Sequence, residues 1–513
     1  MDHTSINSKR PPYGILAILM IGAFITFLNN TLLNVALPSI MSDLHVDTAT
    51  IQWLTTGFML VNGIMIPTTA FLIQKYTVRR LFIVAMSLFS IGTVMAGIAH
   101  AFPILLSARM VQASGSAIMM PLLMNVMLVS FPVAKRGAAM GMFGLILMFA
   151  PAIGPTLSGW IVEHYNWRML FYFVAPISIG ILIVAIFLLR DKKGKVDIRL
   201  DFFSLLLSSV GFGGLLYGFS SAGNRGWDSP HTYATVIIGA ISLFWFIKRQ
   251  LKLSQPMLNF TIFKFPMFSL SAAITMIINM ALFSGFLLLP IYTQTVLGFS
   301  PMETGLMMLP GALLNAAMSP LTGKLFDRIG GRILAVTGLM ITMIVTYAFS
   351  HLSTETDYLY LMLLHAGRMV GFSMIMMPIQ TNGLNQLPAR FYPHGTAMNN
   401  TFSQISGAIG TALLVTVMAN REVSHTAQLT SEAMKVFGEQ IPEEILHGIG
   451  MKAMVEGINF SFFMSSVLIL IALILAFFMK KATPAEDPFE EKEIQVSSQD
   501  DPLVTKVEDS AHR

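Results

Sequence analysis

Long apolar stretches alternate with short polar connections along most of the chain. Fourteen of these stretches are about 20 residues long, which is the length that an α-helix needs to cross a bilayer. They cover residues 14–37, 50–73, 81–100, 104–130, 137–160, 168–190, 201–220, 233–250, 267–294, 303–322, 332–351, 357–380, 395–419 and 458–480. Transmembrane barrel strands are about half as long and alternate apolar with polar positions. The pattern therefore predicts an all-α integral membrane protein with fourteen transmembrane helices.

The charged residues support this prediction and orient the chain. Only 12% of the residues are charged, against about 25% in a typical soluble domain. Most of the basic residues lie in alternate connections, for example at Lys75, Arg79 and Arg80 and from Lys480 onward. Because cytoplasmic loops are enriched in Lys and Arg, we expect both termini in the cytoplasm and the chain in the plasma membrane. The net charge of +5 follows from these loops and indicates no nucleic-acid partner.

The chain offers little for catalysis. It contains no cysteine, which excludes disulfides and metal sites with cysteine ligands. It also has no phosphate-binding glycine loop, no paired histidines at metal-ligand spacing and no nucleophile constellation. We expect neither enzyme activity nor a cofactor or metal.

An internal repeat divides the chain into two halves. ARMVQASGSAIMMPLLMN (108–125) resembles GRMVGFSMIMMPIQTN (367–382), and the two copies begin in the fourth and twelfth apolar stretches. Both copies enter the membrane from the same side, as in transporters with two parallel six-helix repeats. We therefore expect a cytoplasmic N-terminus, two six-helix halves separated by two inserted helices, and a disordered acidic tail. The respective ranges are 1–13, 14–190 and 267–480, 191–266, and 481–513. Residues 421–456 are expected to form an extracellular loop that is partly helical.

Five short motifs resemble those of the major facilitator superfamily, specifically its fourteen-helix drug:proton antiporters of the EmrB/QacA and lincomycin-resistance type. They are LNNTLLNVALP (28–38), RMVQASGSA (109–117), APAIGPTLSGW (150–160), NWRMLF (166–171) and GKLFDRIGGR (323–332). The resemblance implies the major facilitator fold, in a bacterial membrane, and alternating access driven by proton exchange. Two positions depart from the family pattern: Asn29 replaces an Asp, and Gln74 replaces the acid in the first-half copy of the loop motif.

Polar residues inside the apolar stretches are the candidates for a substrate cavity. Arginine and amide side chains are costly in hydrocarbon, so they face partners or a wet cavity. The predicted set is Asn29, Asn30, Asn34, Asn62, Arg109, Gln112, Asn125, Arg368, Asn382, Asn399 and Gln404. Each amide is equally compatible with a bond between helices, and each arginine with helix packing. The 38 methionines suit a broad apolar pocket, because flexible thioethers repack around different ligands.

Proton coupling needs a group that titrates, and no Asp or Glu lies deep in an apolar stretch. The candidates are Glu163, His365 and Arg109. For conformational control the resemblance points to Gly154, Pro155 and Gly159 in the fifth stretch. A further candidate is a charged latch of Asp327, Arg328 and Arg332 with the dipole of the following helix.

The function predicted from the sequence is a monomeric secondary active exporter of lipophilic or amphipathic molecules, exchanged for protons. Because Arg109 and Arg368 suit neutral or anionic molecules, an exporter of lipids or fatty acids with the same fold is the main alternative. A receptor or scaffold without transport is a remote one.

Overall fold

The computed structural model describes residues 13–46, 48–51, 53–190, 201–227, 229–438 and 441–483. Within these ranges the chain is a bundle of long helices without strands. The N-terminal segment 1–12 and the tail from 484 onward, which we expect to be disordered, lie outside the described residues, as does the connection 191–200.

The first half contains six long helices and one short one. They are α1 (Tyr13–Asp43), α2 (Thr48–Ile51), α3 (Trp53–Lys75), α4 (Val78–Gly97), α5 (Phe102–Ser130), α6 (Arg136–His164) and α7 (Arg168–Leu188). The inserted pair is α8 (Phe202–Arg225) and α9 (Pro230–Gln250). The second half consists of α10 (Pro266–Ile291), α11 (Pro301–Ile329), α12 (Gly331–Ala348), α13 (Tyr358–Ser373), α14 (Met376–Asn385), α15 (Tyr392–Phe437) and α16 (Glu443–Ala476).

The helices agree with the predicted spans. Eleven described helices are long and apolar enough to cross a membrane, or twelve if the bent pair Trp53–Met65 and Pro67–Lys75 is one span. The two further long helices are α10, which contains the shorter apolar helix Pro266–Leu282, and α11, which has 29 residues. Together α13 and α14 replace one predicted span, because the helix is interrupted between Ser373 and Met376. The structure is therefore compatible with fourteen spans.

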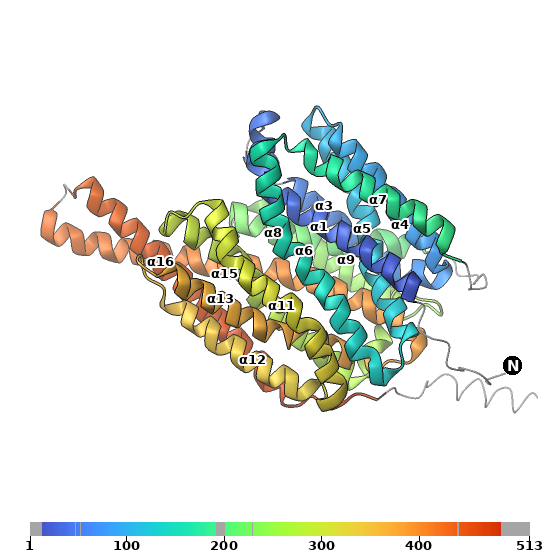
Figure 1. Ribbon diagram of the computed structural model, residues 1–513. Helices are drawn as coiled ribbons and strands as arrows, with labels where there is room; N and C mark the ends of the chain where they lie inside the picture. Colours follow the sequence, from blue (N-terminus) through green and yellow to red (C-terminus); the bar gives the residue numbers. More distant parts are fainter. Residues whose placement is uncertain are drawn as a thin grey trace, which may run out of the picture.

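The helix directions define two sides of the bundle. We call the side on which α1 begins and α16 ends the terminal side, and the opposite side the hairpin side (Figure 1). On the hairpin side α15 and α16 extend beyond the rest of the bundle (Figure 1). With 46 residues, α15 is about 69 Å long, roughly twice the thickness of a bilayer core.

This extension differs from the expected loop at 421–456. Helix α15 continues to Phe437 and α16 begins at Glu443, so almost the whole segment is helical. Arg421 and Glu456 form an ion pair of 2.8 Å across the base of the hairpin, and Gly438 ends α15 with a φ of 67°. Helix formation is favoured here because the paired helix supplies tertiary contacts that the sequence pattern of one segment does not reveal.

The inserted pair contacts both halves. Helix α8 packs against α3 of the first half and α15 of the second. The rings of Trp53 and Tyr217 stack at 5.8 Å, and Trp227 donates a hydrogen bond of 2.8 Å to the hydroxyl of Thr416. Helix α9 covers α8 from outside and is mostly exposed, as expected for a helix that faces lipid.

The apolar cores show where the halves meet. The core of the first half continues into residues from the terminal side of the second half, including Phe268, Leu384 and Tyr392. A separate core on the hairpin side, around Tyr292 and Phe462, contains only residues of the second half. The halves therefore share an apolar core on the terminal side, which the core on the hairpin side around Tyr292 does not join.

Candidate functional site

Arg109 on α5 is fully buried and bound by neutral groups. Its Nη1 donates to Oε1 of Gln112 at 2.9 Å, and its Nη2 donates to Oδ1 of Asn30 at 3.0 Å. The guanidinium carbon lies 4.3 Å from the centroid of the Phe58 ring, a distance at which cation and ring attract each other. The guanidinium thus contacts side chains from α1, α3 and α5.

The network around Arg109 continues to α4. Nε2 of Gln112 donates to Oγ1 of Thr93 at 2.8 Å, and that hydroxyl donates to the carbonyl of Phe89. Hydrogen bonds to a charged group contribute about 1.5–3 kcal/mol each. The network therefore fixes four helices of the first half around one cation, and the predicted residues Asn30, Arg109 and Gln112 are brought together.

The other first-half amides are more loosely arranged. Asn29 is buried and its Nδ2 has no hydrogen-bond partner among the described residues. Within the same described ranges Oδ1 of Asn125 also lacks a partner, and Asn62 is buried on α3. The side chain of Asn34 lies outside the described residues. An unpaired buried amide costs about 1–3 kcal/mol, so a water molecule or ligand group that paired with Asn29 or Asn125 would be stabilising.

Arg368 on α13 occupies the repeat position of Arg109 but has different surroundings. It is buried, and its Nε and Nη2 have no hydrogen-bond partner within the described part of the chain. Its guanidinium lies directly against Gly285 of α10, where an added Cβ would be 2.1 Å from Nη1. The ring of Phe462 on α16 is 5.9 Å from the guanidinium carbon.

His365 lies one turn before Arg368. Its ring is buried against Gly311 of α11, and its Nδ1 lacks a hydrogen-bond partner among the described groups. The structure thus places two of the predicted site residues, one cationic and one titratable, at the same level of the second half.

The remaining predicted cavity residues of the second half lie elsewhere. Nδ2 of Asn382 donates to the carbonyl of Lys480 and its Oδ1 accepts from the N–H of Ala482, so this amide fixes the chain after α16 on the terminal side. Asn399 is buried and Gln404 half-buried on α15. Neither lies in the hydrogen-bonded group around Arg109.

The sequence analysis did not name several buried amides, among them Asn279 and Asn315. Asn279 on α10 has an unpartnered Nδ2 within the described residues, and Asn315 on α11 donates to the sulfur of Met369 at 3.7 Å. Both interrupt apolar stretches in the same way as the predicted amides, so the same signal could have found them.

Helices α6 and α11 form the contact between the halves on the terminal side. A Cβ at Gly141 would lie 2.5 Å from the carbonyl of Ser319, and a Cβ at Gly323 would lie 2.2 Å from that of Gly137. Only residues without a side chain permit this approach. The small residues of the fifth predicted stretch thus explain the packing of one half on the other.

Asp327 joins the halves at this contact. Its two carboxylate oxygens accept hydrogen bonds of 2.9 Å from the backbone N–H groups of Gly137 and Ala138, in the first turn of α6. Burial raises the pKa of the Asp327 carboxyl, and these two donors act against the rise. A carboxylate at a helix N-terminus is favoured by the helix dipole. The predicted latch therefore involves a helix dipole, but that of α6 in the other half rather than that of the following helix.

Other predicted conformational residues are less engaged. Arg328 and Arg332 are exposed. A Cβ at Gly154 would lie 2.3 Å from Oγ1 of Thr31, so this glycine lets α6 approach α1, whereas a Cβ at Gly159 would meet no atom within 4 Å. The side chain of Pro155 lies outside the described residues.

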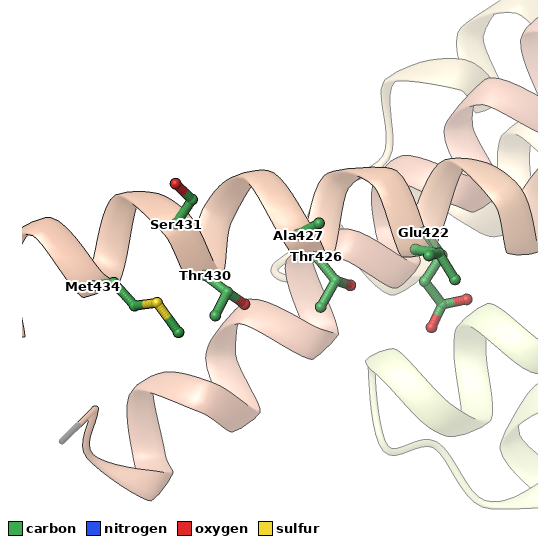
Figure 2. A pocket seen from close by; sticks show the side chains of 7 residues that line it. Glu422, Thr426, Ala427, Thr430, Ser431 and Met434 are labelled. Carbon is green, nitrogen blue, oxygen red and sulfur yellow. The ribbon is translucent and has the colours of Figure 1, made fainter. Parts of the chain in front are cut away.

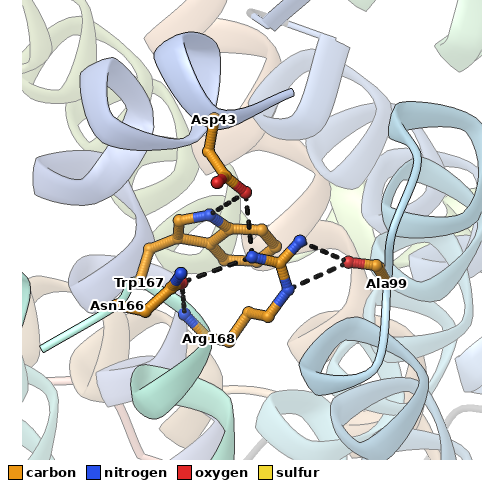
Figure 3. Close-up of polar contacts among 5 residues, drawn as sticks. All are labelled: Asp43, Ala99, Asn166, Trp167 and Arg168. Carbon is orange, nitrogen blue, oxygen red and sulfur yellow. Dashed lines mark hydrogen bonds and ion pairs between the residues drawn. The ribbon is translucent and has the colours of Figure 1, made fainter. Parts of the chain in front are cut away.

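Glu163 is exposed at the hairpin-side end of α6. The neighbouring Arg168 pairs with Asp43 at 2.8 Å and also donates to the carbonyl of Ala99, while Trp167 donates to the same carboxylate (Figure 3). The hydrogen bond from Arg168 lowers the pKa of the Asp43 carboxyl. Because its pKa is depressed, this pair is intact at neutral pH and is lost only in acid. The Asp43–Arg168 pair joins the ends of α1, α4 and α7, and we assign it a structural role and not one in proton transfer.

A groove of about 440 Å³ lies on the hairpin outside the bundle. Thr426, Thr430 and Met434 project from the same face of α15 into it, with Glu422 at its inner end (Figure 2). The sequence analysis assigned no chemistry to this segment, and neither buried arginine lines the groove.

These features define a class of protein: a two-fold repeated helical membrane transporter with polar groups buried inside each half and a contact that joins the halves on one side. The chain belongs to the Major Facilitator Superfamily, whose family profile matches residues 19–411. As a member of a transporter family it is not an enzyme.

Known proteins of this family resemble the chain along most of its length. It is 49% identical to the uncharacterized MFS-type transporter YhcA of Bacillus subtilis, over 83% of this chain and 80% of that protein. It is 42% identical to the lincomycin resistance protein LmrB of Bacillus subtilis, over 91% of this chain and 95% of that protein. These relatives confirm the resemblance to the lincomycin-resistance type.

A solved structure has the same fold. The human organic anion transporter MFSD10 (TETRAN) superposes with a TM-score of 0.64 at 12% identity, covering 91% of this chain and all of that one. At this identity the similarity concerns the fold alone.

Proposed function

We propose that the protein is a secondary active exporter of lipophilic or amphipathic small molecules, which works as a monomer by alternating access and takes up protons in exchange. The relatives with drug-resistance names support the substrate class, and lincomycin is the first compound to test. The terminal side is cytoplasmic in this proposal, as the distribution of basic residues favours.

The observation that carries the proposal is the one-sided contact between the halves. Glycine-mediated packing of α6 on α11 and the Asp327 carboxylate close the terminal side. Alternating access requires such a contact to form on one side and to break when the other side closes. The present arrangement corresponds to the state that is closed toward the cytoplasm.

His365 is the proposed proton carrier. It is buried, its Nδ1 is unpartnered among the described residues, and it lies next to Arg368, whereas Glu163 is exposed at the end of α6. A group that couples protons to transport must change its access between the two states. A buried histidine between helices that move fits this requirement better than an exposed carboxylate.

The test uses proteoliposomes with a pH-sensitive dye inside. A proton gradient is imposed, lincomycin or a lipophilic dye is added, and substrate flux and internal pH are recorded together. We expect substrate-dependent proton movement. Flux without proton movement would contradict the coupling, and binding without any flux would favour a receptor or scaffold.

A matched pair of variants links the assay to the helix contact. Gly141→Val places a side chain against the backbone of α11, whereas Gly159→Val on the same helix meets open space. We expect Gly141→Val to abolish flux and Gly159→Val to retain most of it. Equal activity of the two variants would contradict a role for the α6–α11 contact.

A further inference from the structure

We propose that Arg368 binds the carboxylate, or an equivalent oxyanion, of an amphipathic substrate. This inference rests on the proposed transport function and adds to it a substrate class and a binding residue.

The argument starts from the repeat. Arg109 and Arg368 are both followed by Met and Val, but the next residue is Gln112 in the first half and Gly371 in the second. In the first half the side chain of Gln112 accepts a hydrogen bond from Arg109. In the second half that acceptor is missing because Gly371 has no side chain.

A second difference concerns the first long helix of each half. In the first half, Asn30 of α1 accepts a hydrogen bond from Arg109. In the second half the first helix is α10, and the residue that it places against the guanidinium is Gly285. Among the described residues, therefore, the helix position that holds Gln112 in the first half is a glycine in the second, and the contact of α10 with the guanidinium is also made by a glycine.

The geometry of the unpaired nitrogens indicates the ligand. Nε and Nη2 of Arg368, which lack partners among the described residues, lie on the same edge of the planar guanidinium. Two parallel N–H donors on one edge match the two oxygens of a carboxylate, which binds such an edge in a bidentate way. In Arg109 this edge is not free, because Nη2 is bonded to Asn30.

No described acid of the protein can neutralise Arg368. Every Asp and Glu that the structure places lies near the end of a helix, in a connection or in the α15–α16 hairpin. A buried arginine without a counterion is costly and is retained where it binds something. His365, with its unpartnered Nδ1 one turn away, offers a further polar contact for the same head group.

The experiment compares molecules with one apolar chain and different head groups. The purified full-length protein in a neutral maltoside detergent is equilibrated with radiolabelled dodecanoate, which is then displaced by unlabelled dodecanoate, dodecanol or dodecyltrimethylammonium. The variants are Arg368→Gln, Arg368→Lys and, as a control, Arg421→Gln, which removes an arginine of the hairpin.

We expect wild type to bind dodecanoate about tenfold or more tightly than dodecanol, as loss of a charge-assisted hydrogen bond implies. Arg368→Gln should abolish this preference, Arg368→Lys should keep part of it, and Arg421→Gln should behave as wild type. Equal binding of the three head groups by wild type, or an unchanged preference in Arg368→Gln, would overturn the proposal.

A second pair of variants covers the case in which Arg368→Gln fails to fold. Gly285→Ala places a methyl group on the guanidinium, whereas Gly305→Ala on α11 meets open space. We expect only Gly285→Ala to weaken dodecanoate binding, and an equal affinity of both variants would overturn the proposal.

Flux assays separate this inference from the proposed function. If wild type transports lincomycin but shows no preference for dodecanoate, the inference is wrong and the exporter remains. If it moves neither lincomycin nor dodecanoate in proteoliposomes, the proposed function is wrong, and the inference about a transported substrate falls with it.

Discussion

The two halves hold equivalent arginines in opposite ways. Arg109 donates to Asn30 and Gln112 and lies over the ring of Phe58, so the first half supplies two acceptors for its cation, and only Nε lacks a partner among the described residues. Arg368 lies against Gly285 with two nitrogens that lack partners among the described residues. The same repeat position therefore holds a hydrogen-bonded arginine in one half and, among the described residues, an arginine with two unpaired nitrogens in the other.

This difference indicates that the two repeats of the fold can have different roles. A buried polar network that is satisfied makes a half rigid, whereas unsatisfied groups destabilise it unless a ligand or water pairs with them. In the first half the hydrogen bonds of Arg109 and Gln112 connect α1, α4 and α5. The second half retains binding capacity at the corresponding place.

The largest expected effect is on the stability of variants at the two buried arginines. Replacing Arg109 with Leu leaves Asn30 and Gln112 without their donor, whereas Arg368→Leu removes a guanidinium whose Nε and Nη2 have no described acceptor. From two hydrogen bonds to a charged group we expect Arg109→Leu to be less stable than Arg368→Leu by about 3 kcal/mol or more. Reversible unfolding in mixed detergent micelles measures the difference. Equal stabilities would show that the two sites are not different in kind.

The contact between the halves offers a similar comparison. Asp327 binds the first turn of α6, whereas Gln74, at the repeat position, donates to Ala70 of its own helix. Asp327→Asn turns an amide N–H₂ toward a backbone donor and removes the charge, so we expect the closed state to lose about 2 kcal/mol. Cysteine cross-linking across the terminal side should fall accordingly. The neighbouring exposed Arg328→Gln is the control, and an equal loss in both variants would contradict the latch.

Introducing an acid into the first half should change the pH dependence of transport. Asn29 is buried with an unpartnered Nδ2 within the described ranges, so Asn29→Asp adds a titratable group close to the network around Arg109. We expect the transport rate at one end of the pH range to change by up to about tenfold. The variant should still fold. An unchanged profile in a well-folded variant would show that this position does not sense the transport cycle.

The smallest effect concerns the tie on the hairpin side. Asp43 and Arg168 are partly exposed, so Asp43→Asn should cost about 1 kcal/mol or less. Because Arg168 lowers the pKa of Asp43, wild-type stability should not depend on this pair between pH 5 and pH 8 and should fall only in stronger acid. Unfolding measured against pH in both proteins tests this. A transition near neutral pH that Asp43→Asn removes would contradict it.

Sequence patterns were sufficient for the architecture because apolar length and the repeat are local signals. The long apolar stretches and the two RMV motifs predicted the helices and the relation of the halves. The sequence predicted helix in only part of 421–456, and the full extent of the hairpin could not be predicted because α15 and α16 contact each other.

The candidate site was predicted in part. The inward amides and arginines were found because such residues are rare in hydrocarbon. Which of them bond to one another depends on the packing of helices far apart in sequence. Asn382 reaches the backbone after α16, and Asp327 reaches α6 rather than the following helix. The role of Gly285 and Gly371 could be inferred only from the contacts around Arg368.

The central claim is that the halves alternate between contact on the terminal side and contact on the hairpin side. Because the chain contains no cysteine, pairs of spin labels can be placed without background just outside the two ends of α6, at Ala134 and Tyr165, and on α11, at Ile329 and Met302 respectively. Double electron–electron resonance in nanodiscs would record both distances with and without substrate across a range of pH. We predict that the two distances change in opposite directions. Distances that stay fixed or change together would contradict alternating access.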